Sequence, residues 1–193
     1  GPQANNPNSL GDSFAWGAFI DSKNRLWVGS EGAGLQQYRK DTDDFVHYKN
    51  NNGQDNAISN LYVLHITEDK KGDLWLATYY GLNHFDPETK TFTSWQGDKD
   101  DPTKLSSSII KSLLYSTDNY LWVGTHDNGL NRFDPNTGAV LRIGLDEGLP
   151  SSTVSSLLED NAGNIWVATS NGLARIHPET FQINTYSEGV GLA

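Results

Sequence analysis

The chain has 193 residues with 6 Trp, 8 Tyr, 7 Phe and 19 Gly, contains no Cys, and carries a formal net charge of −10. Nucleic-acid binding depends on clustered Lys and Arg, so this acidic balance argues against a nucleic-acid partner. No apolar stretch is long enough to insert into a membrane, and the lack of Cys excludes disulfides and thiolate metal sites.

The chain begins with a tail at residues 1–4, which resembles a remnant of protease cleavage, and continues into a first unit at residues 5–50. Within this unit, Asp21 and Asn24 predict a hairpin turn, because Asp bonds its own downstream backbone and Asn tolerates positive φ. The four strands expected in this unit are Phe14–Ile20, Leu26–Ser30, Leu35–Arg39 and Phe45–Lys49. The small and branched apolar residues of the first strand predict a fully buried position.

Three similar units follow at residues 51–97, 98–145 and 146–187, and residues 188–193 begin a linker to a next element. The strands expected in them are Leu61–Glu68, Leu74–Thr78, Leu82–Asp86, Phe92–Gln96, Ile109–Tyr115, Leu121–Thr125, Leu130–Asp134, Val140–Ile143, Thr153–Glu159, Ile165–Thr169, Leu173–His177 and Gln182–Ser187.

Each unit centres on a tryptophan in its second strand: Trp27, Trp75, Trp122 and Trp166. A single four-stranded sheet cannot bury both of its faces, so these units must pack on one another. We therefore predict an all-β fold, a β-propeller of four consecutive four-stranded antiparallel blades, with the four indoles in the core between blades. A straight stack of sheets, a β-solenoid, is the competing geometry, although it usually has a shorter period.

The repeated pattern Asp-x-x-Gly-x-Leu/Ile-Trp-Val-Gly/Ala-Thr, followed by Gly-Leu-x-Arg-Phe-Asp-Pro-x-Thr-Gly, resembles the two-component regulator propeller repeats over residues 5–190. In that family such blades usually form the extracytoplasmic input region of hybrid histidine kinases or diguanylate cyclases. The resemblance implies a non-catalytic sensor on the periplasmic or extracellular side of a bacterial membrane protein, with a small molecule or glycan fragment as ligand. Family propellers typically carry seven blades, whereas four are present here.

Four blades in a row leave one apolar face uncovered on the first blade and one on the last. A soluble monomer does not tolerate exposed apolar faces of that size. We expect either a closed four-blade ring or self-association through blades 1 and 4, in which a two-fold dimer completes an eight-blade ring.

Positions that differ among the four units are candidate ligand contacts, because packing does not fix them. An aromatic pair beside acidic and amide groups suits carbohydrates and other polar, ring-bearing small molecules. The candidates lie in the first strands and in the loops between second and third strands: Trp16, Tyr62, His65, Tyr79, Tyr80, Lys111, His126 and Asp127.

Solvated loop residues and a hydrogen-bonded structural His65 are the alternatives to a ligand site. We assign no catalytic residue, metal or cofactor, because no His cluster has metal-ligand spacing and no nucleophile elbow or phosphate loop occurs. Two other functions stay open: a propeller lyase or hydrolase acting on polysaccharide or lactone, and a structural scaffold for protein–protein interaction.

Overall fold

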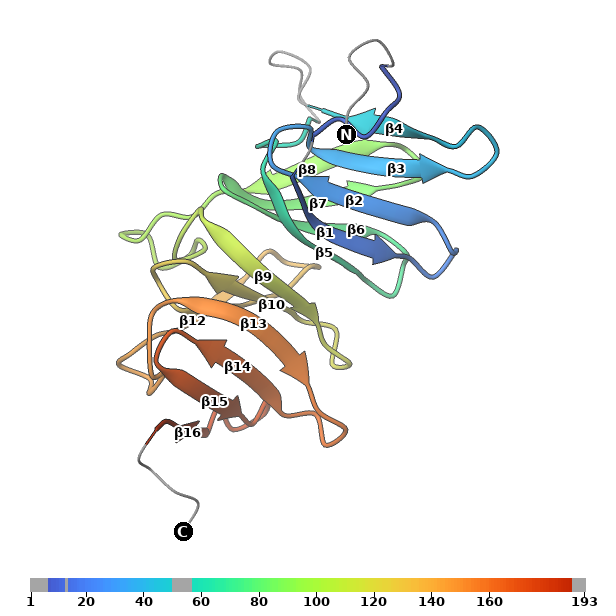
Figure 1. Ribbon diagram of the computed structural model, residues 1–193. Coiled ribbons are helices and arrows are strands. Elements are labelled where there is room, and N and C mark those ends of the chain that lie inside the picture. Colours follow the sequence, from blue (N-terminus) through green and yellow to red (C-terminus); the bar gives the residue numbers. More distant parts are fainter. Residues whose placement is uncertain (1–6, 13, 50–56, 189–193) are drawn as a thin grey trace. The chain divides into compact units, whose positions relative to one another are not determined.

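The computed structural model describes residues 7–12, 14–49 and 57–188, which form sixteen β-strands in four antiparallel sheets (Figure 1). The predicted all-β fold with four-stranded blades is therefore confirmed. The predicted tail at residues 1–4, part of the linker before the second unit and most of the linker at 188–193 lie outside the described residues. Among the described residues, no helix has the length and apolar character needed to cross a membrane.

The chain divides into two compact units, Gly1–Trp95 and Gln96–Ala193. Unit 1 contains two blades, and in each the strands pair in sequence order. Blade 1 consists of β1 (Ala15–Ile20), β2 (Leu26–Ser30), β3 (Leu35–Arg39) and β4 (Asp44–Tyr48), and blade 2 of β5 (Val63–Glu68), β6 (Leu74–Thr78), β7 (Gly81–Asp86) and β8 (Thr91–Trp95).

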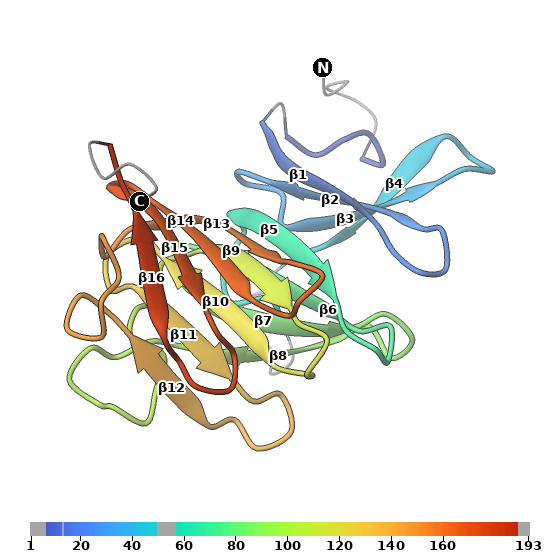
Figure 2. The same cartoon turned by 90° about the horizontal axis from the view of Figure 1, so that it is seen from below.

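Unit 2 also contains two blades with the same strand order (Figure 2). Blade 3 consists of β9 (Ile110–Tyr115), β10 (Leu121–Thr125), β11 (Leu130–Phe133) and β12 (Val140–Ile143), and blade 4 of β13 (Val154–Glu159), β14 (Ile165–Thr169), β15 (Gly172–Ile176) and β16 (Ile183–Tyr186). The second strand of every blade, β3 and β12 have their predicted bounds, and each of the other strands differs from prediction by one or two residues at one or both ends.

The turn between the first two strands of each blade adopts positive φ where the sequence predicted it. The residues concerned are Asn24 (φ 61°), Gly72 (φ 86°), Asn119 (φ 68°) and Gly163 (φ 82°). The residue that opens this turn has a second role, because it also accepts a hydrogen bond from the tryptophan six positions later. In blade 1 the distance between Asp21 Oδ2 and Trp27 Nε1 is 2.8 Å, and in blade 3 Ser116 Oγ replaces the carboxylate at 3.2 Å from Trp122 Nε1.

The core of unit 1 lies between its two blades. Trp27 and Leu35 of blade 1 are fully buried and pack with Ile66, Leu76 and Phe85 of blade 2. The ring centroids of Trp27 and Phe85 are 5.7 Å apart in an edge-on arrangement, which is a favourable geometry for aromatic pairs. Blade 1 thus presents its tryptophan face to the blade that follows it in the sequence.

Unit 2 repeats this packing with other side chains. Trp122 and Leu130 of blade 3 are fully buried in a cluster with Val154, Ile165 and Val167 of blade 4. The packing is therefore the same within each unit: the tryptophan face of the first blade covers the first and second strands of the second blade.

Two expectations about burial are not met. The first strands were expected to be fully buried, but β1 and β13 each expose one face, with Ile20 at 64% and Leu158 at 63% exposure. Trp166 was expected in the core between blades, yet it is partly exposed, because no described strand packs on that face of blade 4. Trp75 is 2% exposed.

Buried amides fix the segments that lead into the first strands. Asn83 Oδ1 accepts the backbone N–H of Ser59 at 2.9 Å, and Asn131 Oδ1 accepts that of Ser106 at 2.9 Å. Gln36 Oε1 holds the N–H of Gly11 at 2.7 Å in the same way. These contacts hold in place the loops at one end of blades 1, 2 and 3, where the candidate ligand contacts lie.

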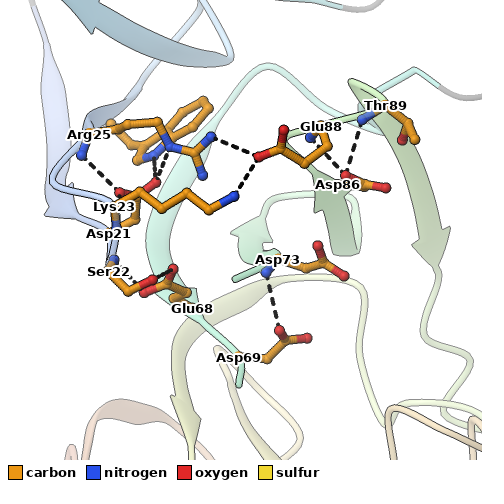
Figure 3. A network of polar contacts seen from close by, with 11 residues as sticks. Asp21, Ser22, Lys23, Arg25, Glu68, Asp69, Asp73, Asp86, Glu88 and Thr89 are labelled. Carbon is orange, nitrogen blue, oxygen red and sulfur yellow. Dashed lines mark hydrogen bonds and ion pairs between the residues drawn. The ribbon is translucent and has the colours of Figure 1, made fainter. Parts of the chain in front are cut away.

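Polar contacts at the other end connect neighbouring blades within a unit. Glu68 of blade 2 accepts the backbone N–H of Ser22 at 2.8 Å and its hydroxyl at 2.7 Å (Figure 3). Glu159 of blade 4 accepts the N–H and hydroxyl of Thr117 of blade 3 at 2.9 Å and 2.5 Å. We call this contact the carboxylate clasp.

Candidate functional site

Exposed aromatic side chains gather at one end of unit 1, where the leads into the first strands and the loops between second and third strands lie. We call this set of side chains the aromatic rim. Its members are Phe14 (65% exposed), Trp16 (54%), Tyr62 (39%), Tyr79 (42%) and Tyr80 (51%). Large apolar rings left in water on one end of a soluble fold are typical of a binding surface.

The rim residue Trp16 lies in a β-bulge at the start of the first strand, and Leu64 lies in the equivalent bulge of blade 2. The pairing of β1 with β2 slips between Ala15 and Gly17, so Trp16 is an extra residue in its strand. The same slip occurs at Lys111 and Ser155 in unit 2. Bulges often reorient a side chain beside a functional site. The bulged residue, which is not paired with the second strand, differs in chemistry in every blade: Trp16, Leu64, Lys111 and Ser155.

The tyrosines of the rim are held by their neighbours. The rings of Tyr62 and Tyr79 meet edge-on with centroids 5.5 Å apart. The backbone N–H of Tyr62 donates to Asn60 Oδ1 at 2.8 Å, and that of Tyr80 donates to Thr78 Oγ1 at 3.1 Å. A ring whose backbone is already ordered loses less conformational entropy when a ligand stacks on it.

The equivalent end of unit 2 is polar rather than aromatic. Lys111 is partly buried, and His126 and Asp127 are exposed. In blade 4 the corresponding loop carries Ser170, whose hydroxyl lies 2.6 Å from Ser151 Oγ. Each unit thus brings together its own subset of the predicted site residues, aromatic in unit 1 and polar in unit 2.

His65 does not join the aromatic rim. It pairs with Ala77 on β6 and lies on the same sheet face as Ala77 and Trp75, since alternate residues of a strand share a face. Burial lowers the pKa of its imidazole below the ordinary value of 6.5, so the neutral form is favoured. This position supports the structural interpretation of His65.

Phe14 is a rim residue that was not predicted from the sequence. Phe14 and Tyr62 occupy the same position in blades 1 and 2, and Ile109 and Thr153 occupy it in blades 3 and 4. The backbone carbonyl of Phe14 accepts the N–H of Glu31 at 3.0 Å, which ties this position to the neighbouring loop. The signal that could have found it was variation among the residues at the start of the predicted first strands, one step before the observed strands begin.

One group of described side chains could hold a cation. Single ligand atoms of Asp69, Asp73 and His84 lie within 4.8 Å of one another. Asp69 already accepts the indole N–H of Trp75 at 3.0 Å, and His84 Nε2 lies 3.0 Å from Asp73 Oδ2. The same positions in blade 1 hold Asp21, Arg25 and Gln37, where the guanidinium of Arg25 pairs with Asp21. The arrangement in blade 2 is thus also accounted for by hydrogen bonds beside a turn.

Comparisons with known proteins agree with this architecture. Residues 57–80 and 148–171 match the family model described as "Two component regulator propeller". Histidine kinase P4 from Formosa agariphila is 36% identical over 172 residues, which are 86% of this chain and 12% of that protein. The chain therefore spans about an eighth of the length of this relative.

Solved structures of other proteins share this fold. The extracellular domain of a hybrid two component system from B. thetaiotaomicron aligns with a TM-score of 0.82 and 25% identity, over 97% of this chain and 25% of that one. Virginiamycin B lyase from Staphylococcus aureus aligns with a TM-score of 0.70 over 92% of this chain and 57% of its own, but with 16% identity this likeness concerns the fold alone.

Proposed function

The chain contains repeats of the two component regulator propeller family, and from this premise we propose that it is a non-catalytic, ligand-binding segment of an extracytoplasmic sensor. Its blades would bind a solute outside the cytoplasm, and a signalling region elsewhere in a longer bacterial protein would respond to occupancy. The extracellular sensor domain that shares this fold over 97% of the chain supports this location.

The aromatic rim is the observation that carries the proposal. Five exposed rings at one end of unit 1 offer flat apolar surfaces, and Glu31, Asp12 and Asn60 supply acceptors in the neighbouring loops. Stacking combined with a few hydrogen bonds is how proteins bind sugar rings. The net charge of −10 favours a neutral oligosaccharide over one rich in uronic acids or sulfate.

A second candidate, a propeller lyase or hydrolase, has a specific observation in its favour, because lyases are among the proteins that share the fold. Catalysis of that kind needs an acid and a base at one site. In the described part of unit 1, the rim residues are aromatic, and His65 lies on the sheet face of Trp75 rather than in the rim loops. The sensing role is therefore the better supported of the two.

The binding test uses the 193-residue chain with a panel of neutral hexasaccharides, screened by thermal shift and followed by calorimetry on any hit. We expect Tyr79→Ala and Trp16→Ala each to weaken affinity about fivefold, since one stacked ring contributes on the order of 1 kcal/mol. Both side chains are exposed, so the melting temperature of the free protein should change little.

Tyr79→Phe is the matched control, because it keeps the ring and should retain most of the affinity. Loss of binding in Lys111→Ala or His126→Ala, with Tyr79→Ala unaffected, would move the site to unit 2. Formation of a new product from a hexasaccharide or a lactone would favour the enzyme instead.

A further inference from the structure

Blade 2 brings two carboxylates and an imidazole together beside its first hairpin turn. Asp69 opens this turn and Asp73 closes it, since the backbone N–H of Asp69 donates to the carbonyl of Asp73 at 2.9 Å (Figure 3). His84 lies on β7, where it pairs with Trp75. The three side chains are partly buried, and single ligand atoms of all three lie within 4.8 Å of one another. We call Asp69, Asp73 and His84 the blade 2 corner.

The other three blades place an arginine at this corner. In blade 1 it is Arg25, at the position of Asp73, and its Nε lies 2.5 Å from Asp21 Oδ2. In blades 3 and 4 the arginine occupies the position of His84, paired with the tryptophan of the second strand: Arg132 and Arg175. Blade 2 has an arginine at neither position. A guanidinium therefore lies at the corner in every blade except the second.

The charge of the corner changes accordingly. In blades 1 and 4 the three positions carry one acidic, one basic and one neutral residue: Asp21, Arg25 and Gln37 in blade 1, and Asp160, Asn164 and Arg175 in blade 4. The blade 2 corner instead has two carboxylates and an imidazole, and the exposed Lys70 and Lys71 of the same turn compensate them only weakly, because solvent screens exposed charges. One divalent cation bound to the carboxylates would restore the balance.

The ligand atoms select the class of ion. One imidazole nitrogen with two carboxylate oxygens suits Zn²⁺ or another first-row divalent ion, whereas Ca²⁺ takes about six to eight oxygen ligands. A tetrahedral Zn²⁺ with bonds of about 2.1 Å holds its ligands about 3.4 Å apart. Because His84 Nε2 and Asp73 Oδ2 are already 3.0 Å apart, an ion between them requires only a small movement of these side chains.

Trp75 holds two of the three ligands in place. Its indole N–H donates to Asp69 Oδ2 at 3.0 Å, and its ring centroid lies 4.8 Å from that of His84. The hydrogen bond leaves a second lone pair on the carboxylate oxygen for an ion. Ligands that are oriented before an ion arrives lose less entropy on binding, and contacts behind the ligands raise metal affinity.

We propose that the blade 2 corner binds a divalent first-row metal ion such as Zn²⁺ through His84 Nε2 and the carboxylates of Asp69 and Asp73, with water completing the coordination. The ion takes the place of the arginine of the other blades and joins the turn to β7. The blade 2 corner lies before the first residue of β6, and Tyr79 of the aromatic rim follows its last residue, so the two sites are at opposite ends of this strand.

The experiment uses the 193-residue chain, stripped of metal with EDTA and dialysed, and titrates it with zinc chloride by calorimetry. We expect one zinc ion per chain and a melting temperature that rises with zinc concentration, because an ion that binds only the folded chain stabilises it. Asp73→Asn keeps the shape of the side chain and removes its charge. It should weaken zinc binding about tenfold or more, since even changes behind the ligands have effects of that size.

His84→Arg separates loss of the site from loss of the fold. It introduces the residue that blades 3 and 4 have at this position, so it should melt near the temperature of the metal-free chain and no longer respond to zinc. His126→Ala is the matched control, because it removes an exposed imidazole in unit 2 and should leave zinc binding unchanged. In NMR spectra of the five histidine side chains, zinc should shift the imidazole signal that is missing from His84→Arg.

A chain whose melting temperature and calorimetric signal do not respond to zinc would overturn the proposal and leave the corner with its hydrogen bonds alone. Zinc binding that persists unchanged in His84→Arg, or that is lost equally in His126→Ala, would overturn it as well.

Discussion

At the scale of the residue, each carboxylate that opens a turn accepts hydrogen bonds both from the turn backbone and from the tryptophan indole. Asp160 accepts the indole N–H of Trp166 at 2.8 Å, the side-chain amide of Asn164 and the backbone N–H groups of Ala162 and Asn164. These hydrogen bonds favour the charged form, and they lower the pKa of Asp160 from 3.8 to about 2. The turn and the tryptophan are thus coupled through one ionised group.

The pKa of Asp21 is also lowered, but here burial and hydrogen bonding act in opposite directions. Burial raises the pKa of this carboxyl, but hydrogen bonds from the Trp27 indole and from Arg25 outweigh that effect. Arg25 Nε lies 2.5 Å from Asp21 Oδ2, which compensates the charge as the carboxylate becomes buried.

These shifts predict acid sensitivity. The folded-state pKa of Asp160 lies below its unfolded value of about 3.8, so its contribution to stability is complete above about pH 4 and is lost as the pH falls towards 2. Asp160→Ser copies the arrangement of Ser116 in blade 3, which stays neutral at every pH. Urea unfolding at pH 7, 4 and 2.5 should therefore show a smaller loss of stability in this variant than in the unaltered chain. Identical pH profiles would contradict the coupling.

At the scale of the element, glycine and alanine alternate in the second strands for a steric reason. A Cβ added at Gly124 would lie 2.3 Å from Ser112 Oγ and 2.6 Å from Val154 Cγ1 of the next blade. Gly29 is equally close to Val63 in unit 1, with 2.7 Å to its Cγ1. Blades 2 and 4 have Ala77 and Ala168 at this position. Glycine therefore marks the blades whose tryptophan face packs on a valine of the following blade.

Gly124→Ala should lower the free energy of unfolding by about 1 to 3 kcal/mol, the usual cost of overpacking a closely fitted core. Gly144→Ala is the matched control, because its Cβ would meet only the flexible carboxylate of Glu147 at 3.4 Å. Urea denaturation followed by fluorescence measures both. A Gly124→Ala variant as stable as Gly144→Ala would show that blades 3 and 4 do not pack this closely in solution.

The sequence predicted the strands better than the register. The second strands were predicted without error, because the Leu/Ile-Trp pair and the positive-φ turn before it fix where each begins. The bulges at Trp16, Leu64, Lys111 and Ser155 could not be predicted, since a bulge is a property of two paired strands and leaves no periodic signal in one. For the same reason, the sequence could not show that His65 pairs with Ala77 on the sheet face of Trp75.

At the scale of the whole molecule, the repeating element is a pair of blades rather than a single blade. Ser22, Gly29 and Glu68 of unit 1 correspond to Thr117, Gly124 and Glu159 of unit 2. The two segments that match the family model, 57–80 and 148–171, both begin before the first strand of the second blade in a pair. The single-blade period was evident in the sequence, whereas the two-blade period depends on contacts between side chains far apart in the chain.

The candidate site, too, could be predicted only in part from the sequence. Variation among repeats drew attention to Trp16, Tyr79 and Tyr80, whose side chains are exposed in unit 1, and their role in binding stays a prediction. Which of the variable residues share an end of a unit could not be read from the sequence, because it depends on the sheet pairing. The ligand of the aromatic rim stays a prediction for experiment.

The most direct test of the account is a two-dimensional NMR spectrum of the six tryptophan indole N–H groups, recorded with and without a neutral hexasaccharide that shifts the melting temperature. We predict that the Trp16 signal moves on titration, whereas the signals of Trp27 and Trp122, buried between blades, stay in place. A Trp16 signal that stays unchanged at saturating sugar would contradict the claim that this chain binds its ligand through the aromatic rim.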